Sequence, residues 1–165
     1  MALEPRSKER IDSDILAAGC QAGFVVVPEF SLRYQPVRGR KQTDVAWIAD
    51  AEDRGVYRVV AAFEVEGFDV PLTTIDSHVR LYSRIQKTEG IEFPCYIPLY
   101  SRAIHRPNYG RSLDRVQRCL SKRSASAAKH RDVVQVCDGS VREWLVQATA
   151  KAKHLAAALT QTAAQ

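Results

Sequence analysis

Residues 57–66, Tyr-Arg-Val-Val-Ala-Ala-Phe-Glu-Val-Glu, decide the fold that we expect for this chain. Residues 59–63 are all apolar, and a continuous apolar run of this length is typical of a strand that is covered on both faces. Glu64 and Glu66 follow this run directly. Because alternate residues of a strand point to the same face, we expect the two glutamates to lie side by side at the end of a central strand.

The segments around this strand predict an α/β fold made of one domain over residues 1–165. Two strands precede it, at 24–34 and at 44–48, and short polar loops between the three predict an antiparallel meander. Apolar periodicity and capping residues predict helices and further strands elsewhere. The helices are expected over 6–22, from Pro71 to about Lys87, in a short segment beginning at Ser112, and from Ser140 to about Leu159, and the strands at 93–100 and 131–137.

Composition indicates an ordinary globular protein. Hydrophobic residues make up 45% of the chain and charged residues 26%, which a disordered chain would not show. The first ten residues are charged and no apolar run is long enough to span a membrane, so a cytoplasmic location is expected. The cysteines form no CxxC pair, which gives no indication of a zinc site.

The net charge of +5 is distributed unevenly along the chain. Residues 44–92 contain ten acidic and five basic residues, whereas residues 101–131 contain nine Lys or Arg and one Asp. Two predicted helices carry basic stripes that can contact a phosphate backbone, although a solvated helix face has the same pattern. The stripes consist of Arg80, Arg84 and Lys87 in one helix and of Arg111, Arg115, Arg118 and Lys122 in the other.

An acidic cluster is expected where Asp44, on the neighbouring strand, approaches Glu64 and Glu66. Carboxylates at the end of a buried strand are costly to desolvate unless a cation compensates their charge, and carboxylate oxygens are ligands that Mg²⁺ or Mn²⁺ accepts. Such an ion can activate a water molecule and neutralise charge on a phosphate. Glu66 is a candidate for a general base or a further ligand.

Asp44, nineteen intervening residues and then Phe63-Glu64-Val65-Glu66 resemble the PD-(D/E)XK nuclease superfamily, whose fold is restriction-endonuclease-like. The resemblance covers roughly residues 6–137 and includes the expected order of helices and strands. It implies that Asp44, Glu64 and the backbone carbonyl of Val65 bind the metal, and that the substrate is DNA. It implies a Mg²⁺- or Mn²⁺-dependent endonuclease with Asp44, Glu64 and Glu66 as catalytic residues.

The chain departs from the family pattern at two places. Glu66 stands where the motif usually has lysine, and no proline precedes Asp44. Lys41 is a candidate for the missing positive charge. The alternative reading is therefore a module that keeps the nuclease fold and binds nucleic acid without cutting it. A homodimer would place two sites on a duplex, and the lone His78 is interpreted as a surface or packing residue.

Overall fold

The computed structural model describes residues 8–34, 39–51, 56–67, 72–89, 93–100, 134–137 and 141–162. The antiparallel meander is confirmed. Strand β1 (Val25–Tyr34) pairs with β2 (Gly39–Ala51), and β2 pairs with β3 (Val56–Phe63), both antiparallel. Val45 lies opposite Phe63 in the register of β2 and β3. Asp44 therefore stands at the position where β3 gives way to the glutamates.

The later strands are added in parallel, which makes the sheet mixed. Strand β5 (Cys95–Tyr100) runs parallel to β3, and β6 (Val134–Cys137) and the short β4 (Glu66–Gly67) both run parallel to β5. Within the described residues, β3 lies between β2 and β5. The prediction that the apolar run forms a central strand is confirmed, since residues 60–63 are fully buried.

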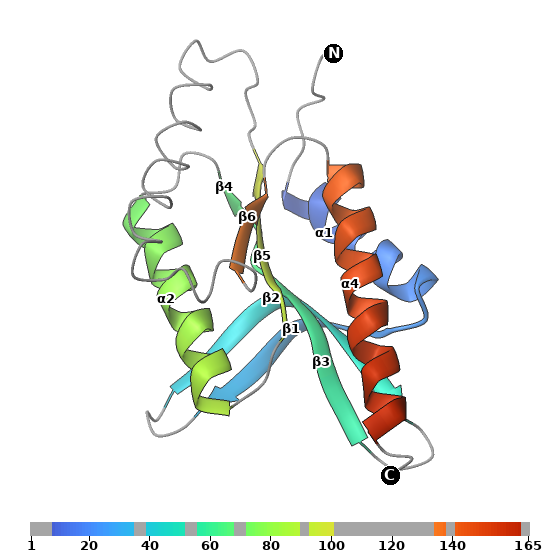
Figure 1. Cartoon of the computed structure of the whole chain (residues 1–165). Helices are drawn as coiled ribbons and strands as arrows, with labels where there is room; N and C mark the ends of the chain where they lie inside the picture. Colours follow the sequence, from blue (N-terminus) through green and yellow to red (C-terminus); the bar gives the residue numbers. More distant parts are fainter. Residues whose placement is uncertain are drawn as a thin grey trace.

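Helices cover both faces of the sheet (Figure 1). Helices α1 (Lys8–Gln21) and α4 (Val141–Thr162) lie side by side over one face, where Trp47 and Phe63 belong to the same apolar core as both helices. Helix α2 (Leu72–Glu89) covers the other face through Tyr82 and Ile85. The predicted α/β architecture with flanking helices is thus present in the described residues. None of the described helices has the length and apolarity needed to cross a membrane.

Helix α1 packs unusually closely on β2. Gly19 is buried, and a Cβ atom at this position would lie 2.6 Å from Val26 Cγ2 and closer still to the indole of Trp47. The indole Nε1–H donates a hydrogen bond to the carbonyl oxygen of Ile15 at 3.2 Å. The absence of a side chain at Gly19 therefore lets the helix sit directly on the tryptophan.

Element boundaries differ from the predictions at several places. The second strand was expected at 44–48, but β2 covers Gly39–Ala51, and α2 continues past Lys87 to Glu89. The third strand was expected to reach Glu66, but β3 ends at Phe63 and Glu66 belongs to β4, because this part of the chain leaves β2 and pairs with β5. The final helix continues past Leu159 to Thr162. The predicted helix beginning at Ser112, together with its basic stripe, lies outside the described residues.

Candidate functional site

The site is built where β3 separates from β2. The Glu64 N–H donates to the Tyr96 carbonyl oxygen at 2.9 Å, so the backbone stays bonded to β5 after the strand pairing with β2 has ended. On the β2 side, the hydroxyl of Thr43 donates to the Phe63 carbonyl oxygen at 2.7 Å. A buried side chain thus satisfies a backbone acceptor at the point where the ladder ends. These bonds fix the direction in which Glu64 leaves the strand.

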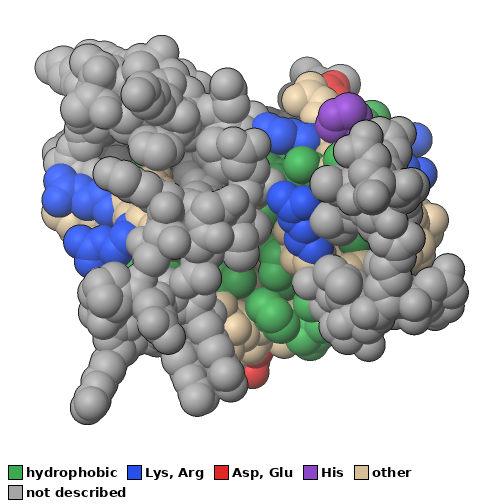
Figure 2. All heavy atoms as spheres, turned by 60° about the horizontal axis from the view of Figure 1, so that its bottom comes forward, with side chains coloured by type: hydrophobic (Ala, Val, Ile, Leu, Met, Phe, Trp, Pro, Cys, Tyr) green, Lys and Arg blue, Asp and Glu red, His purple; other side chains and the backbone are tan. Residues whose placement is uncertain are grey.

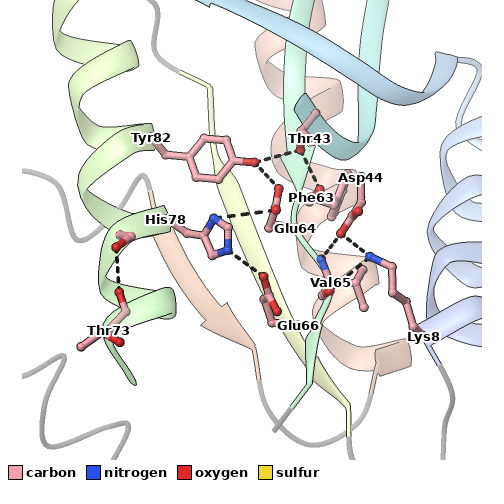
Figure 3. Close-up of polar contacts among 11 residues, drawn as sticks. Lys8, Thr43, Asp44, Phe63, Glu64, Val65, Glu66, Thr73, His78 and Tyr82 are labelled. Atoms are coloured by element: carbon pink, nitrogen blue, oxygen red, sulfur yellow. Dashed lines mark hydrogen bonds and ion pairs between the residues drawn. The ribbon is translucent and has the colours of Figure 1, made fainter. Parts of the chain in front are cut away.

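Glu64 is a buried carboxylate, with 7% of its surface exposed, and Tyr82 of α2 holds one of its oxygens. The Tyr82 hydroxyl lies 2.9 Å from Glu64 Oε2 and 2.9 Å from Thr43 Oγ1 (Figure 3). A phenol has one proton, so it donates to one of these acceptors at a time. Burial raises the pKa of Tyr82, and the negative charge of Glu64 raises it further. The same two causes, in the same order, raise the pKa of the buried Cys95 thiol.

His78 lies between the two glutamates. Its Nε2 is 2.6 Å from Glu66 Oε1, and its Nδ1 is 3.7 Å from Glu64 Oε1. The imidazole is 14% exposed, against 10% for the Glu64 side chain and 21% for that of Glu66. His78 and Tyr82 are four residues apart on α2 and therefore share one helix face. This face is the one turned toward the end of β3 (Figure 3).

These residues form a group of the kind that can hold a divalent ion. Glu64, Glu66 and His78 each offer one ligand atom, and the three atoms lie within 4.8 Å of one another. Two carboxylates and one imidazole are a common donor set for divalent metals. The residues present therefore fit a metal ion in number and chemistry.

Asp44 and Lys8 lie on the other side of the strand end (Figure 3). The ammonium of Lys8, the first described residue of α1, is 2.7 Å from Asp44 Oδ2 and donates to the Val65 carbonyl oxygen at 3.3 Å. The Val65 N–H donates to the same Asp44 oxygen at 2.7 Å. Residue 65 thus joins the two halves of the site, because its neighbours Glu64 and Glu66 point toward His78 while its own backbone contacts Asp44 and Lys8.

Lys8 is held as a cation by this arrangement. Burial opposes its charge, but the hydrogen bond and negative charge of Asp44 outweigh burial, with help from Asp12 and Glu64, and the pKa of Lys8 is raised. Burial raises the pKa of Asp12 on the same helix, although the charge of Lys8 acts in the opposite direction. The Lys8 ammonium is a fixed positive charge beside a mainly acidic group.

The predicted acidic residues come together in part. Glu64 and Glu66 do lie on one side, since both contact His78, as the sequence predicted. Asp44 is near the strand end but its Oδ2 is engaged by Lys8 and the Val65 N–H, and the Val65 carbonyl accepts from Lys8. That Asp44 and the Val65 carbonyl bind metal stays a prediction.

The predicted basic contacts are described only in part. Arg80 and Arg84 are exposed on α2, while the Lys87 side chain and residues 111–122 lie outside the described part of the structure. On the face drawn in Figure 2, the Lys and Arg side chains of the described residues occur in several places with hydrophobic side chains between them. Contact of the predicted basic residues with nucleic acid stays a prediction.

Four residues of the site were not selected from the sequence: Lys8, Thr43, His78 and Tyr82. His78 was interpreted as a lone surface or packing residue, but it is neither isolated nor on the surface, since it is 14% exposed and contacts both glutamates. Its four-residue spacing from Tyr82, followed by Ile85, was a usable signal for a shared buried face. Lys8 gave no such signal, because Val65 is 57 residues away in the chain. The proposed substitute, Lys41, has a side chain outside the described part.

Comparison with known proteins adds no family. No protein-family model, curated protein or solved structure matches this chain. The functional interpretation therefore depends on the geometry and chemistry of the site.

Proposed function

We propose that this protein is a metal-dependent nuclease of the restriction-endonuclease-like type that hydrolyses phosphodiester bonds in DNA. The observation that carries the proposal is the arrangement around Val65. A group of two glutamates and a histidine that could hold a metal ion lies on one side of this residue, and an Asp44–Lys8 ion pair lies on the other. Candidate metal ligands on one side of a strand residue and an ammonium on the other supply two kinds of positive charge that phosphoryl transfer can use.

Each residue has a stated part in this proposal. Glu64 and His78 supply ligands for the divalent ion, with Glu66 beside them, and a bound ion would polarise the scissile phosphate and acidify a water molecule. The Lys8 ammonium binds a phosphate oxygen or stabilises the developing negative charge. Asp44 positions Lys8 and is a further candidate ligand. The basic residues of α2 and of the segment 111–122 contact the phosphate backbone.

Lys8 also addresses the main departure from the family pattern. The motif usually carries lysine at the position of Glu66, two residues after Glu64 along the strand. In this chain α1 brings an ammonium to the carbonyl of Val65, the residue between those two glutamates. A lysine from a different element can therefore supply the positive charge that Glu66 cannot.

One observation favours the alternative, a module that binds nucleic acid without cutting it. The Lys8 ammonium, at 2.7 Å, engages Oδ2 of Asp44, the acid that the resemblance assigns to the metal. If this pair persists with DNA bound, Oδ2 of Asp44 is not available as a metal ligand. The alternative predicts salt-sensitive DNA binding that Asp44→Asn leaves unchanged.

Cleavage of supercoiled plasmid and of single-stranded DNA tests the proposal. Purified wild-type protein is incubated with Mg²⁺, Mn²⁺ or EDTA and compared with Glu64→Gln and Asp44→Asn. Glu143→Gln, an exposed acid on α4, is the matched control. Metal-dependent nicking in wild type and control but not in Glu64→Gln supports the nuclease. If the protein binds DNA but every form of DNA stays intact, the nuclease proposal is excluded and the module that binds without cutting remains.

A further inference from the structure

The hydrogen-bonding capacity of His78 determines which of its nitrogens can take a metal. Its Nε2 lies 2.6 Å from Glu66 Oε1, and a carboxylate oxygen accepts but does not donate. Nε2 is therefore the protonated nitrogen. In a neutral imidazole the other nitrogen, Nδ1, then carries a lone pair.

That lone pair faces another acceptor. Nδ1 is 3.7 Å from Glu64 Oε1, too far for a hydrogen bond but close enough for one cation to contact both atoms. The other oxygen of the same carboxylate, Oε2, is 2.9 Å from the Tyr82 hydroxyl. Two acceptors that converge in this way, from a buried carboxylate and a mostly buried ring, are stabilised by a cation between them.

The separations distinguish ligands from supporting groups. Two ligand atoms that each lie about 2.0–2.2 Å from one ion are roughly 3 Å or more apart. The Nδ1–Oε1 pair, at 3.7 Å, is within a small adjustment of this spacing. The Nε2–Oε1 pair, at 2.6 Å, is too short for two ligands of one ion but has the length of a charge-assisted hydrogen bond.

We infer that His78 Nδ1 and Glu64 Oε1 are ligands of a first-row transition-metal ion, and that Glu66 is a positioning residue that orients the imidazole. In the same way, the Tyr82 hydroxyl orients the Glu64 carboxylate through its contact with Oε2. Histidine ligands usually donate their second N–H to a carboxylate or carbonyl, which fixes the ring. An imidazole ligand favours transition metals over Mg²⁺, which takes oxygen ligands. This assignment deepens the proposed function, and the part of the metal in DNA cleavage rests on that function.

Metal binding, measured apart from cleavage, tests this assignment. Mn²⁺ and Mg²⁺ are titrated calorimetrically into metal-free protein, and pulsed electron paramagnetic resonance of bound Mn²⁺ detects coupling to a directly bound ¹⁴N. Mn²⁺ is expected to bind at least about tenfold more tightly than Mg²⁺. The wild-type spectrum is expected to show a ¹⁴N ligand.

Variants separate the ligand from the positioning residue. His78→Ala is expected to remove the ¹⁴N coupling and to weaken Mn²⁺ binding about 100-fold, whereas Glu66→Gln keeps the coupling and weakens binding about tenfold, because Gln still offers an acceptor. His154→Ala, an exposed histidine on α4, is the control and is expected to change neither. If His78→Ala does not fold, the presence or absence of ¹⁴N coupling in the wild type decides whether a nitrogen ligand binds the metal.

The outcomes separate this inference from the nuclease proposal. Bound Mn²⁺ without ¹⁴N coupling, equal affinity for Mg²⁺ and Mn²⁺, loss of the coupling in Glu66→Gln, or no metal binding overturns the assignment. Mn²⁺ binding with His78-dependent coupling but no DNA cleavage leaves the metal site standing and removes the nuclease. Metal-dependent cleavage without a nitrogen ligand on the metal would leave the nuclease proposal standing and remove the assignment of His78 as a ligand.

Discussion

Removing the hydroxyl of Tyr82 should destabilise the protein because this group stabilises a buried carboxylate. The hydroxyl is 2.9 Å from Glu64 Oε2 and 2.9 Å from Thr43 Oγ1, and all three residues are buried. A hydrogen bond to a charged group contributes about 1.5–3 kcal/mol, and Tyr82→Phe also leaves a buried acceptor short of a donor. We expect a loss of about 2 kcal/mol in the free energy of unfolding.

Equilibrium unfolding by denaturant, followed by thermal unfolding, measures this loss. For a protein of this size, about 2 kcal/mol corresponds to a fall of roughly 4–8 °C in the unfolding midpoint. Thr43→Val removes the other hydroxyl at similar volume, so the double variant completes a thermodynamic cycle. Because the two hydroxyls are in contact, their effects should be non-additive by about 1 kcal/mol.

Two results would refute this reasoning. A change below about 0.5 kcal/mol for Tyr82→Phe would mean that the hydroxyl contributes no more than an ordinary surface group. Additivity of the two substitutions within about 0.3 kcal/mol would mean that Thr43 and Tyr82 are not energetically connected. Either result would remove the basis for treating Tyr82 as the residue that positions Glu64.

Three further predictions concern packing, the ammonium and DNA binding. Gly19→Ala should lower the free energy of unfolding by about 1–3 kcal/mol, because its Cβ would overlap the side chains beneath α1. Denaturant unfolding measures this loss, and full retention of stability would show that the helix shifts freely. Lys8→Met should lower the single-turnover cleavage rate about 100-fold while its partly exposed ion pair changes stability by less than about 1 kcal/mol. Lys153→Met, on the exposed face of α4, is its control, and equal rates in the two variants would exclude a role for Lys8. Replacing Arg80 or Arg84 by Ala should reduce the slope of log affinity for DNA against log salt by about one for each phosphate that the arginine neutralises, and an unchanged slope would place the DNA elsewhere.

The parts of the fold that could be predicted are those set by local pattern. The apolar run of residues 59–63 and the short polar loops around it were sufficient to predict a central strand and an antiparallel meander. The strand's end could not be placed correctly in the same way. It depends on where pairing with β2 stops while pairing with β5 continues, and both strands are distant in the sequence from this segment.

The site was predictable to the same extent. The strand period was enough to bring Glu64 and Glu66 together, because residues two apart share a face. His78 was misjudged because its relation to the glutamates depends on how α2 packs on the sheet, although its spacing from Tyr82 indicated a common face. Lys8 could not have been found, since it reaches Val65 from a helix 57 residues earlier in the chain.

The central claim is that the carboxylate of Glu64 supports metal-dependent phosphodiester cleavage. Its most direct test is the single-turnover rate of cleavage of an end-labelled DNA duplex, measured against Mn²⁺ concentration for the wild type and for Glu64→Gln. Thermal unfolding first establishes that both proteins are folded. A role of Glu64 in metal-dependent cleavage predicts a rate that saturates with Mn²⁺ in the wild type and falls at least about 100-fold in Glu64→Gln. Equal metal-dependent rates in the two proteins would contradict it.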